Sequence, residues 1–417
     1  MAKVKIEGGH PLHGTVRVSG AKNAALPLLA ATVLFDGETL LTNVPNLSDV
    51  TTMVRMLRSI NIIAEQHNNQ IRIVNRKDIK HVIPYELVTK MRASFFIAGP
   101  ILARTGMVRI PMPGGCAIGS RPVDIHLKGF QALGATVKLE HGFIEIKATK
   151  LIGNTVAFSF PSVGATENIM MAASLAEGDT TITNAACEPE IVDLATMLNA
   201  AGAKITGAGT ATIKITGVKS LKGISHPVIP DRIEAGTFIL AGLITGADLT
   251  VSHMNVEHQA ALLASIRDTG AVVEIIDEQT VRTLPNQKWK AADITTQPFP
   301  GFPTDMQAQM MTFLCLAEGT SMVKEHIFEN RFMHCGELSR MGAQIKIDDR
   351  TAVITGVAKL SGTEVQATDL RAGAALWLAG LVAEGETIIY DIEHVERGYD
   401  KLTEKLANVG AVIKRLS

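Results

Sequence analysis

The sequence lacks most of the features that define membrane, secreted and nucleic-acid-binding proteins. Aromatic residues make up only 4% of its 417 residues, and the formal net charge of −1 gives no general electrostatic footprint for nucleic acid. No charge-free apolar run reaches the roughly 18 residues of a membrane span. The first residues, MAKVKIEGG, lack the long apolar segment of a signal peptide. These absences predict a soluble, cytoplasmic protein.

Metal and cofactor motifs are also missing. The four cysteines, Cys116, Cys187, Cys315 and Cys335, match neither a zinc pattern nor the disulfide framework of a secreted protein. The histidines form no spaced cluster, and the glycines form neither a nucleotide P-loop nor a dinucleotide fingerprint. We therefore expect no metal and no cofactor, and a reducing compartment.

The main feature that is present is an internal repeat. Apolar, helix-like runs such as TFILAGLIT each end at a glycine and lead into a short β-prone strand. A second, amphipathic helix and a strand pair follow, so the predicted unit is helix, strand, helix, strand, strand. The glycines that mark the six copies lie 66 to 73 residues apart: Gly37, Gly106, Gly178, Gly246, Gly319 and Gly385.

Six copies of an α/β unit predict two domains of three repeats each. Two prolines flank the change of repeat near Ile229–Asp231. Residues 1–20 contain a strand pair with no repeat before it, and the last repeat ends on a lone strand. We therefore expect residues 1–20 to complete the last repeat. The predicted domains are residues 21–229, and residues 1–20 together with 230–417, with the chain crossing between them twice.

Cationic residues recur at the expected helix starts. Asn23 (with Lys22 beside it), Arg92, Gly164, Arg232, Asp305 and Arg371 occupy equivalent positions of the six first helices, and Arg121 and Arg397 begin two of the second helices. A helix N-terminus disfavours cations, so the set predicts a site for a multiply anionic ligand. The alternative is that they pair with acidic residues on a solvated face. Asp305, the single acid, could act as a general base or as a helix N-cap.

The run Pro111–Pro122, PMPGGCAIGSRP, is the least regular part of the chain. It falls in the second repeat, which carries a few extra residues there. Three glycines surround Cys116, and Arg121 follows, so the run is a candidate mobile lid whose thiol donates a proton. The alternative is a surface turn with an incidental cysteine. Ser162, in SVGATEN, could offer donors to a ligand or serve as an N-cap.

These motifs together resemble one family. SGAKNAALP, PGGCAIGSRPVD, SVGATEN, PGFPTDMQAQ and FENRFMH are similar to the UDP-N-acetylglucosamine enolpyruvyl transferases, and the similarity runs over the whole chain. The resemblance implies an inside-out α/β barrel pair, two domains of three repeats each. It also implies transfer of enolpyruvate from phosphoenolpyruvate to the 3′-hydroxyl of UDP-N-acetylglucosamine, through a tetrahedral ketal and without metal. This is the first committed step of peptidoglycan precursor synthesis.

The resemblance also implies a role for each site residue. Cys116 would protonate the methylene carbon of phosphoenolpyruvate and is the position that fosfomycin alkylates in the family. Asp305 would accept the proton of the sugar hydroxyl. The implied substrate contacts are Lys22, Arg121 and Arg397 with Asn23 for the phosphate, Arg331 and Arg371 for the carboxylate and domain closure, and Arg92, Arg121, Pro122, Val123, Asp124, Ile125, Ser162, Val163 and Ile327 for the UDP-sugar.

Some interpretations remain open on the sequence. Phe160 stands where some members carry a lysine near the nucleotide, so the resemblance does not say how the uracil end is held. The sister enolpyruvyl transferase that acts on shikimate 3-phosphate shares the architecture but lacks the cysteine-bearing loop. A non-catalytic six-repeat clamp would need a diffuse basic lining, and the cations here sit at helix starts instead. We expect a monomer, because the sequence shows no coiled coil and no spare apolar face.

Overall fold

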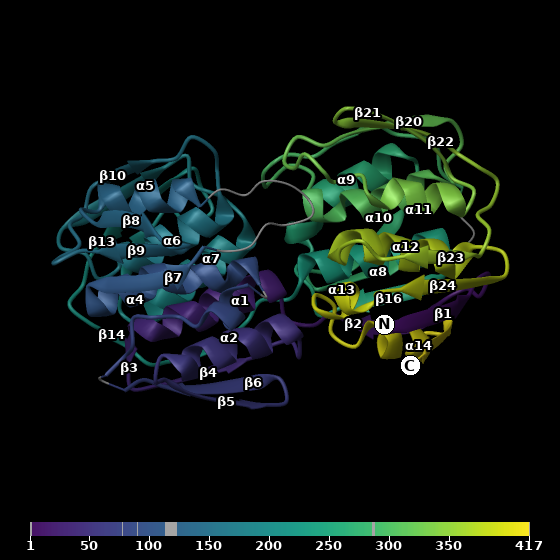
Figure 1. The fold of residues 1–417 in the computed structure, drawn as a ribbon. Coiled ribbons are helices and arrows are strands. Elements are labelled where there is room, and N and C mark those ends of the chain that lie inside the picture. The colour runs from purple at the N-terminus through teal and green to yellow at the C-terminus, as the bar shows by residue number, and fades with distance from the viewer. Residues whose placement is uncertain (1, 77, 90, 113–122, 286–287, 417) are drawn as a thin grey trace. The chain divides into compact units, whose positions relative to one another are not determined.

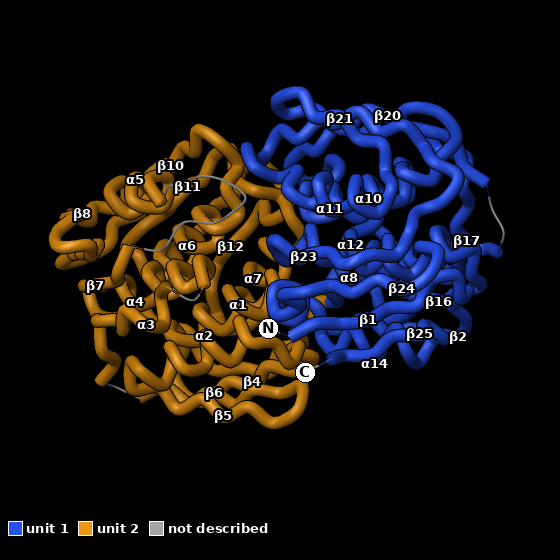
Figure 2. The backbone as a smooth tube through the Cα atoms, turned by 45° about the vertical axis from the view of Figure 1, so that its right-hand side comes forward, with its two compact units in different colours: residues 1–19, 117–120, 230–417 blue, residues 20–116, 121–229 orange. Residues whose placement is uncertain are grey.

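The computed structural model describes residues 2–416 except 77, 90, 113–122 and 286–287. These described residues divide into two compact units (Figure 2). The inserted unit comprises residues within 20–229, and the terminal unit comprises residues 2–19 and 230–416, so it contains both described chain ends. Each unit has a hydrophobic core of its own. Within the described part of the chain, no helix combines the length and hydrophobicity needed to cross a membrane.

The inserted unit places three buried helices at its centre and three larger sheets outside them, and its described residues also form a two-stranded sheet (Figure 1). Its helices are α1 (Lys22–Ala31), α2 (Ser48–Ser59), α3 (Tyr85–Val88), α4 (Ala98–Thr105), α5 (Asp124–Ala132), α6 (Val163–Ala173) and α7 (Pro189–Ala200), with 3-10 turns η1 (Thr32–Leu34) and η2 (Arg92–Ile97). Its strands are β3 (Phe35–Asp36), β4 (Glu38–Thr42), β5 (Ile63–His67), β6 (Gln70–Val74), β7 (Met107–Pro111), β8 (Thr136–Glu140), β9 (Phe143–Lys147), β10 (Thr155–Ala157), β11 (Asp179–Thr183), β12 (Lys204–Thr206), β13 (Thr212–Thr216), β14 (Leu221–Lys222) and β15 (Ser225–Pro227).

The terminal unit repeats this arrangement around α8, α10 and α12 (Figure 1). Its helices are α8 (Arg232–Ile244), α9 (Ala260–Asp268), α10 (Gln307–Leu314), α11 (His334–Arg340), α12 (Leu370–Val382), α13 (Glu393–Glu396) and α14 (Leu402–Asn408), with η3 (Glu257–Gln259) and η4 (Thr304–Met306). Its strands are β1 (Lys3–Glu7), β2 (His13–Arg17), β16 (Asp248–Ser252), β17 (Val273–Asp277), β18 (Thr280–Thr283), β19 (Ile294–Thr295), β20 (Thr320–Lys324), β21 (Gln344–Asp348), β22 (Thr351–Thr355), β23 (Glu364–Gln366), β24 (Glu386–Tyr390) and β25 (Val412–Leu416).

The helices lie inside because they are apolar on every side. In α12, all residues from Arg371 to Leu381 are buried, and in α8 all residues from Ile233 to Ile244 are buried. A helix that is apolar all round has no face to offer to water. The strands instead alternate, as in β22, so each sheet shows one face to the helices and one to solvent. This is the inside-out α/β arrangement that the resemblance implies.

Five of the described sheets contain one strand more than the predicted repeat, whereas the sheet β7–β9–β8 has the predicted three. In the sheet β19–β20–β22–β21, β19 is a two-residue strand that runs parallel to β20. The corresponding extra strands elsewhere are β10, β15, β23 and β2, each pairing in parallel with the first strand of a repeat. These strands connect one repeat to the next.

The prediction for residues 1–20 was right for one strand and wrong for the other. β1 lies between β24 and β25, in register with both, and thereby completes the sheet of the last repeat. β2 does not join this sheet but pairs with β16, the first strand of the fourth repeat. The reason is that β24 and β25 already occupy both edges of β1, so no edge remains for a hairpin partner.

The chain passes between the units twice, and each unit ties the two passages together. In the terminal unit, the Asp231 backbone N–H donates to the Ser19 carbonyl at 2.8 Å. In the inserted unit, the Ala21 N–H donates to the Ile229 carbonyl at 2.7 Å. The first and last residues of the inserted unit are therefore neighbours.

Candidate active site

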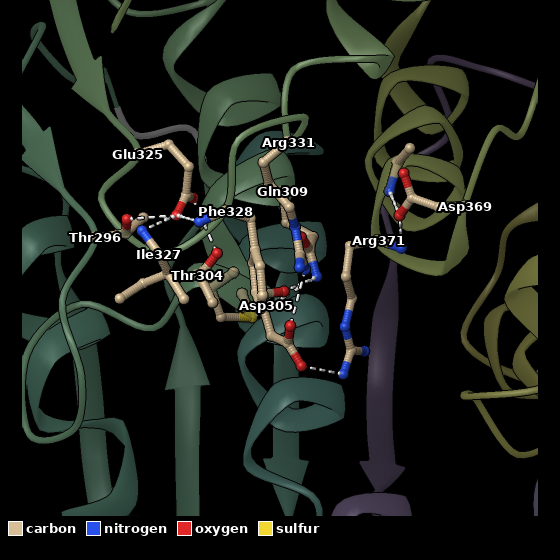
Figure 3. Close-up of polar contacts among 12 residues, drawn as sticks. Thr296, Thr304, Asp305, Gln309, Glu325, Ile327, Phe328, Arg331, Asp369 and Arg371 are labelled. Carbon is tan, nitrogen blue, oxygen red and sulfur yellow. Dashed lines mark hydrogen bonds and ion pairs between the residues drawn. The ribbon is translucent and has the colours of Figure 1, made fainter. Parts of the chain in front are cut away.

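The central feature of the terminal unit is a carboxylate held by two arginines. Asp305 Oδ1 accepts a hydrogen bond from Arg331 Nη2 at 2.8 Å, and Asp305 Oδ2 accepts one from Arg371 Nη2 at 2.8 Å (Figure 3). The arginine side chains are only 3% and 5% exposed, whereas the Asp305 side chain is 26% exposed. The carboxylate is thus the part of this cluster that solvent can reach.

The local fold explains why Asp305 is available. It lies in η4, and α10 begins after it at Gln307, with no side-chain capping bond to either helix. The N-cap interpretation of Asp305 is therefore wrong, because its two oxygens are taken by guanidinium groups. Arg371 is placed by Asp369, the N-cap of α12, whose carboxylate accepts from the Arg371 N–H at 2.8 Å.

The electrostatics of the cluster favour an ionised Asp305. Burial by itself would raise the pKa of Asp305, but the adjacent charges of Arg371 and Arg331 outweigh it and hold that pKa well below the usual range. Burial likewise works against the charge of Arg371, and Asp305 more than compensates, so the pKa of Arg371 is raised. At neutral pH the cluster carries one negative and two positive charges.

The two arginines retain unused hydrogen-bonding capacity. Arg331 Nη1 and Arg371 Nη1 are both buried, and neither has a hydrogen-bond partner among the described residues. A buried donor without a partner is unfavourable, so these nitrogens suit an anion that could bind beside Asp305. The centre of the Tyr399 ring lies 5.6 Å from the guanidinium carbon of Arg371. The Tyr399 hydroxyl lies 2.9 Å from Thr237 Oγ1.

Two further predicted site residues, Arg397 and Ile327, lie in this unit, and Arg397 is not at the helix start that was predicted for it. Arg397 directly follows α13 and precedes α14, so it does not begin the second helix of its repeat. That helix is divided because Lys401 adopts a left-handed conformation with φ 52°. Ile327 follows β20 in a segment that leads to Phe328 and Arg331. The Arg331 guanidinium carbon lies 5.1 Å from the Phe328 ring.

In the inserted unit, Lys22 and Asn23 begin α1 as predicted. Lys22 Nζ lies 3.6 Å from Asp49 Oδ2, and both side chains are largely buried. Asp49 is in the first turn of α2, where an acidic residue suits the helix dipole. The positive charge at the start of α1 therefore has an acidic neighbour, which sequence reasoning missed.

Arg92 begins η2, the 3-10 turn that leads into α4, and His126 of α5 faces it. Burial, and then the charge of Arg92, lowers the pKa of His126 to about 3. Asn168 of α6 joins these elements, because its Nδ2 donates to the Phe95 carbonyl at 2.8 Å and lies 3.1 Å from His126 Nδ1. His126 is thus a neutral ring whose Nε2 carries the hydrogen in this network.

Ser162 and Val163 stand at the start of α6. Ser162 is the N-cap, and its Oγ accepts from the Ala165 N–H at 3.4 Å, which confirms the capping interpretation. Val123 is the residue before α5, and Asp124 and Ile125 form its first turn. Asp124 is exposed and lies 3.7 Å from Lys128 Nζ. Phe160 is also exposed, at 42%.

Cys116, Arg121 and Pro122 lie outside the described residues. The structure describes two other thiols that are buried, those of Cys315 and Cys335. Burial raises the pKa of Cys315 to about 12, and burial together with the neighbouring Cys315 does the same for Cys335. Neither thiol is suited to proton transfer at neutral pH.

Sequence reasoning overlooked several residues that support the site. Asp369 had a readable signal, since an aspartate just before an apolar helix is a typical N-cap. His126 was noticed only for its position near a cationic helix start. Asp49 had no signal in the sequence, because its neighbour Lys22 belongs to another helix.

Comparison with known proteins identifies the class. A family model described as EPSP synthase (3-phosphoshikimate 1-carboxyvinyltransferase) matches residues 6–406, so the chain belongs to this family of enolpyruvyl transferases.

Within that family the chain belongs with the UDP-N-acetylglucosamine 1-carboxyvinyltransferases. It is 55% identical to UDP-N-acetylglucosamine 1-carboxyvinyltransferase 1 of Caldanaerobacter subterraneus subsp. tengcongensis, over 99% of both chains. It is 54% identical to UDP-N-acetylglucosamine 1-carboxyvinyltransferase 2 of Carboxydothermus hydrogenoformans, over 100% of both. The resemblance inferred from the motifs is confirmed.

Solved structures agree on the fold. The enolpyruvyl transferase NikO from Streptomyces tendae matches with a TM-score of 0.89 and 25% identity, over 99% of both chains. An EPSP synthase from Acinetobacter baumannii matches with a TM-score of 0.78 over 100% of both chains, and its 18% identity shows the fold alone. The fold is the two-domain inside-out α/β barrel of the enolpyruvyl transferases.

Proposed function

We propose that this chain transfers the enolpyruvyl group of phosphoenolpyruvate to the 3′-hydroxyl of UDP-N-acetylglucosamine and releases phosphate. The observation that carries the proposal is the Asp305 cluster: a partly buried carboxylate held by two arginines, whose other buried nitrogens, Arg331 Nη1 and Arg371 Nη1, have no partner among the described residues. An anionic substrate beside a base is what this arrangement suits. The full-length relatives supply the identity of the two substrates by their names.

The chemistry consists of an addition and an elimination. In the addition, the sugar oxygen bonds to C2 of phosphoenolpyruvate, its proton passes to Asp305, and Cys116 gives a proton to C3. The product is a tetrahedral ketal. In the elimination, the C2–O bond to phosphate breaks, C3 returns a proton to the Cys116 thiolate, and the proton taken up by Asp305 leaves with phosphate, so the double bond and both groups are restored. General acid and base groups at the two reacting centres typically contribute a factor of about 10²–10⁴ each.

The remaining predicted residues bind the substrates in this proposal. The guanidinium groups of Arg331 and Arg371 hold the carboxylate of phosphoenolpyruvate, while Asp305 remains ionised between them. The phosphate is assigned to Lys22, Asn23, Arg121 and Arg397, and the UDP-sugar to Arg92, Arg121, Pro122, Val123, Asp124, Ile125, Ser162, Val163 and Ile327. Lys22 begins α1, where the helix N-terminus also favours an anion, and its present acidic neighbour is Asp49.

The proposal also covers the state and place of the enzyme. We propose a monomer that acts in the cytoplasm, where its nucleotide-sugar and phosphoenolpyruvate substrates are made. Light scattering of the purified chain, with and without both substrates, tests the monomer.

Phosphate release from phosphoenolpyruvate tests the reaction. Release by the wild type should require UDP-N-acetylglucosamine, and Cys116→Ala and Asp305→Asn should each lower turnover by about 10² or more. Asp248→Asn is the matched control, because Asp248 also pairs with an arginine, Arg282, but on an exposed strand. Release that occurs only with shikimate 3-phosphate as the acceptor would assign the chain to the sister activity.

A further inference from the structure

A buried carboxylate outside the assigned residues joins two segments of the terminal unit. Glu325 directly follows β20 and is 0% exposed. Its Oε1 accepts from Thr296 Oγ1 at 2.9 Å and from the backbone N–H groups of Ile327 and Phe328 at 2.8 and 3.1 Å. Its Oε2 accepts from Thr304 Oγ1 at 2.9 Å. One side chain therefore holds four donors from three places in the sequence (Figure 3).

These hydrogen bonds connect Glu325 to the candidate base, Asp305, by two routes. Thr304 is the residue before Asp305, and Asp305 bonds to Arg331 at 2.8 Å. Arg331 ends the segment that begins at Glu325 and passes through Phe328. The segment is thus fixed at one end by the Glu325 carboxylate and at the other by the Asp305 carboxylate, and Thr304 links the two.

Burial alone does not produce such an arrangement in this fold. Glu167 of the inserted unit is also 0% exposed, yet neither of its carboxylate oxygens has a hydrogen-bond partner among the described residues. Burial, and then the charges of Glu190 and Glu188, raises the pKa of Glu167 well above its usual range. Glu325 differs because donors satisfy both of its oxygens, and a satisfied buried polar group specifies one local geometry.

We infer that Glu325 is a positioning residue that fixes the turn containing Asp305 relative to the Ile327–Phe328 segment. The inference rests on the proposed function, in which Asp305 accepts the proton of the sugar hydroxyl and Ile327 contacts the UDP-sugar. Glu325 touches neither substrate in this account and acts through Thr304 on one side and through the backbone of residues 327 and 328 on the other.

The two threonines bond to different carboxylate oxygens of Glu325, so the contribution of each oxygen can be tested separately. The Thr304 hydroxyl donates to Glu325 Oε2, the carboxylate oxygen on the Asp305 side. Thr296 bonds to the other oxygen and also accepts from the His326 N–H at 2.9 Å, so it holds the segment that contains Ile327. Replacing each hydroxyl with a methyl group of nearly the same shape should loosen one side and leave the other.

The test measures steady-state kinetics and UDP-N-acetylglucosamine binding by calorimetry for Thr304→Val and Thr296→Val. Thr304→Val should lower kcat by about 3- to 10-fold with the Kd for UDP-N-acetylglucosamine unchanged, a factor within the range of the net contribution of one typical hydrogen bond. Thr296→Val should raise that Kd and the KM by a similar factor with little change in kcat. Thr304→Ser and Thr296→Ser keep the hydroxyl groups and should restore wild-type values.

Thr216→Val is the matched control, because Thr216 Oγ1 donates to Asp179 Oδ1 at 2.6 Å in the inserted unit, a hydroxyl-to-carboxylate bond of the same kind. It should leave kcat and KM unchanged. A purely structural role for Glu325 predicts that both threonine variants melt at lower temperature and lose kcat in proportion to the folded fraction, with equal Kd values. That result, or wild-type kinetics in both variants, would overturn the inference.

The outcomes also separate this inference from the proposed function. If the wild type releases no phosphate with UDP-N-acetylglucosamine, the proposed function is wrong and the inference falls with it. If the wild type is active and the split between kcat and Kd is absent, the inference alone is wrong. Glu325→Ala should combine both effects, and the threonine variants decide the question even if that variant does not fold.

Discussion

Asp305 lies between two guanidinium groups, and this arrangement acts on its basicity in two opposite ways. Before substrate binds, the arginines hold the carboxylate ionised, which makes it available but weakly basic. In the proposed reaction, the carboxylate of phosphoenolpyruvate engages the same arginines through Nη1. Their positive charge is then shared with a second anion, and the pKa of Asp305 rises towards the value that proton transfer needs.

The lowered pKa of Asp305 predicts a pH-dependent contribution to stability. A carboxylate whose pKa is lower in the folded state stabilises that state above its unfolded pKa, about 3.9, and the contribution disappears as the pH falls through the folded pKa. Asp305→Asn leaves two buried arginines without their counter-charge and should lower the free energy of unfolding by on the order of 3 kcal/mol at pH 7. Urea titrations at several pH values should show this difference constant above about pH 5 and shrinking below about pH 4.

Asp248→Asn again serves as the control. Its exposed pair with Arg282 is screened by solvent, so its effect on stability should be below about 1 kcal/mol at any of these pH values. A difference for Asp305→Asn that grows as the pH falls would contradict the argument, because it would mean that protonation of Asp305 stabilises the fold.

Site residues could be predicted from the sequence where a charged residue stood at a position that its charge does not favour. Arg371 stands out because a cation at a helix start is unfavourable, and Asp305 because it is the single acid among equivalent positions. Glu325 could not be found in this way. Its partners lie up to 29 residues away, and a glutamate after a strand is an ordinary surface residue by composition. Its role exists only once the chain has folded.

Among the elements, β1 has the most demanding position, because it is the central partner of two strands from the other end of the chain. Ile6 of β1 is 0% exposed and lies opposite Thr387 of β24 and Ile413 of β25. Neighbouring Lys5 points away from the core and pairs with Glu386. The strand thus has one side that packs and one that faces water.

Ile6→Ala should therefore be strongly destabilising. Removing a fully buried isoleucine side chain costs about 2 to 5 kcal/mol, through lost burial and the cavity that remains. Lys5→Ala on the opposite side should change the free energy of unfolding by less than about 1 kcal/mol. Urea denaturation of both variants measures the difference, and equal small losses would show that β1 is not packed as described.

The repeat was predictable at the level of elements because apolar, helix-like runs that end at a glycine recur in the sequence at nearly constant spacing. Most of the parallel connecting strands were not, because β19 has two residues and β10 three, too short for an alternating pattern to appear. The partner of β2 was predicted wrongly for a related reason. Strand partners depend on which edges are free, and the sequence does not show that β1 already has neighbours on both sides.

At the scale of the whole molecule, the inserted unit has its own core and adjoining ends. We expect residues 20–229, expressed alone, to unfold cooperatively in urea, because every sheet that the described part of this unit contains is formed from its own strands. A fragment of the same length that spans residues 76–285 cuts through both units and should show no cooperative transition. A broad, gradual transition for residues 20–229 would mean that this unit depends on the rest of the chain.

The position of β1 also constrains the order of events during synthesis. Among the described strands, β1 is synthesised before all others, and its partners β24 and β25 are synthesised after all others. The inserted unit can therefore be complete while residues 3–7 are still unpaired, and the sheet of the last repeat closes only after β25 has been synthesised. A chain that is truncated before β25 would leave one edge of β1 without a partner, so this sheet forms only once residues 412–416 are present.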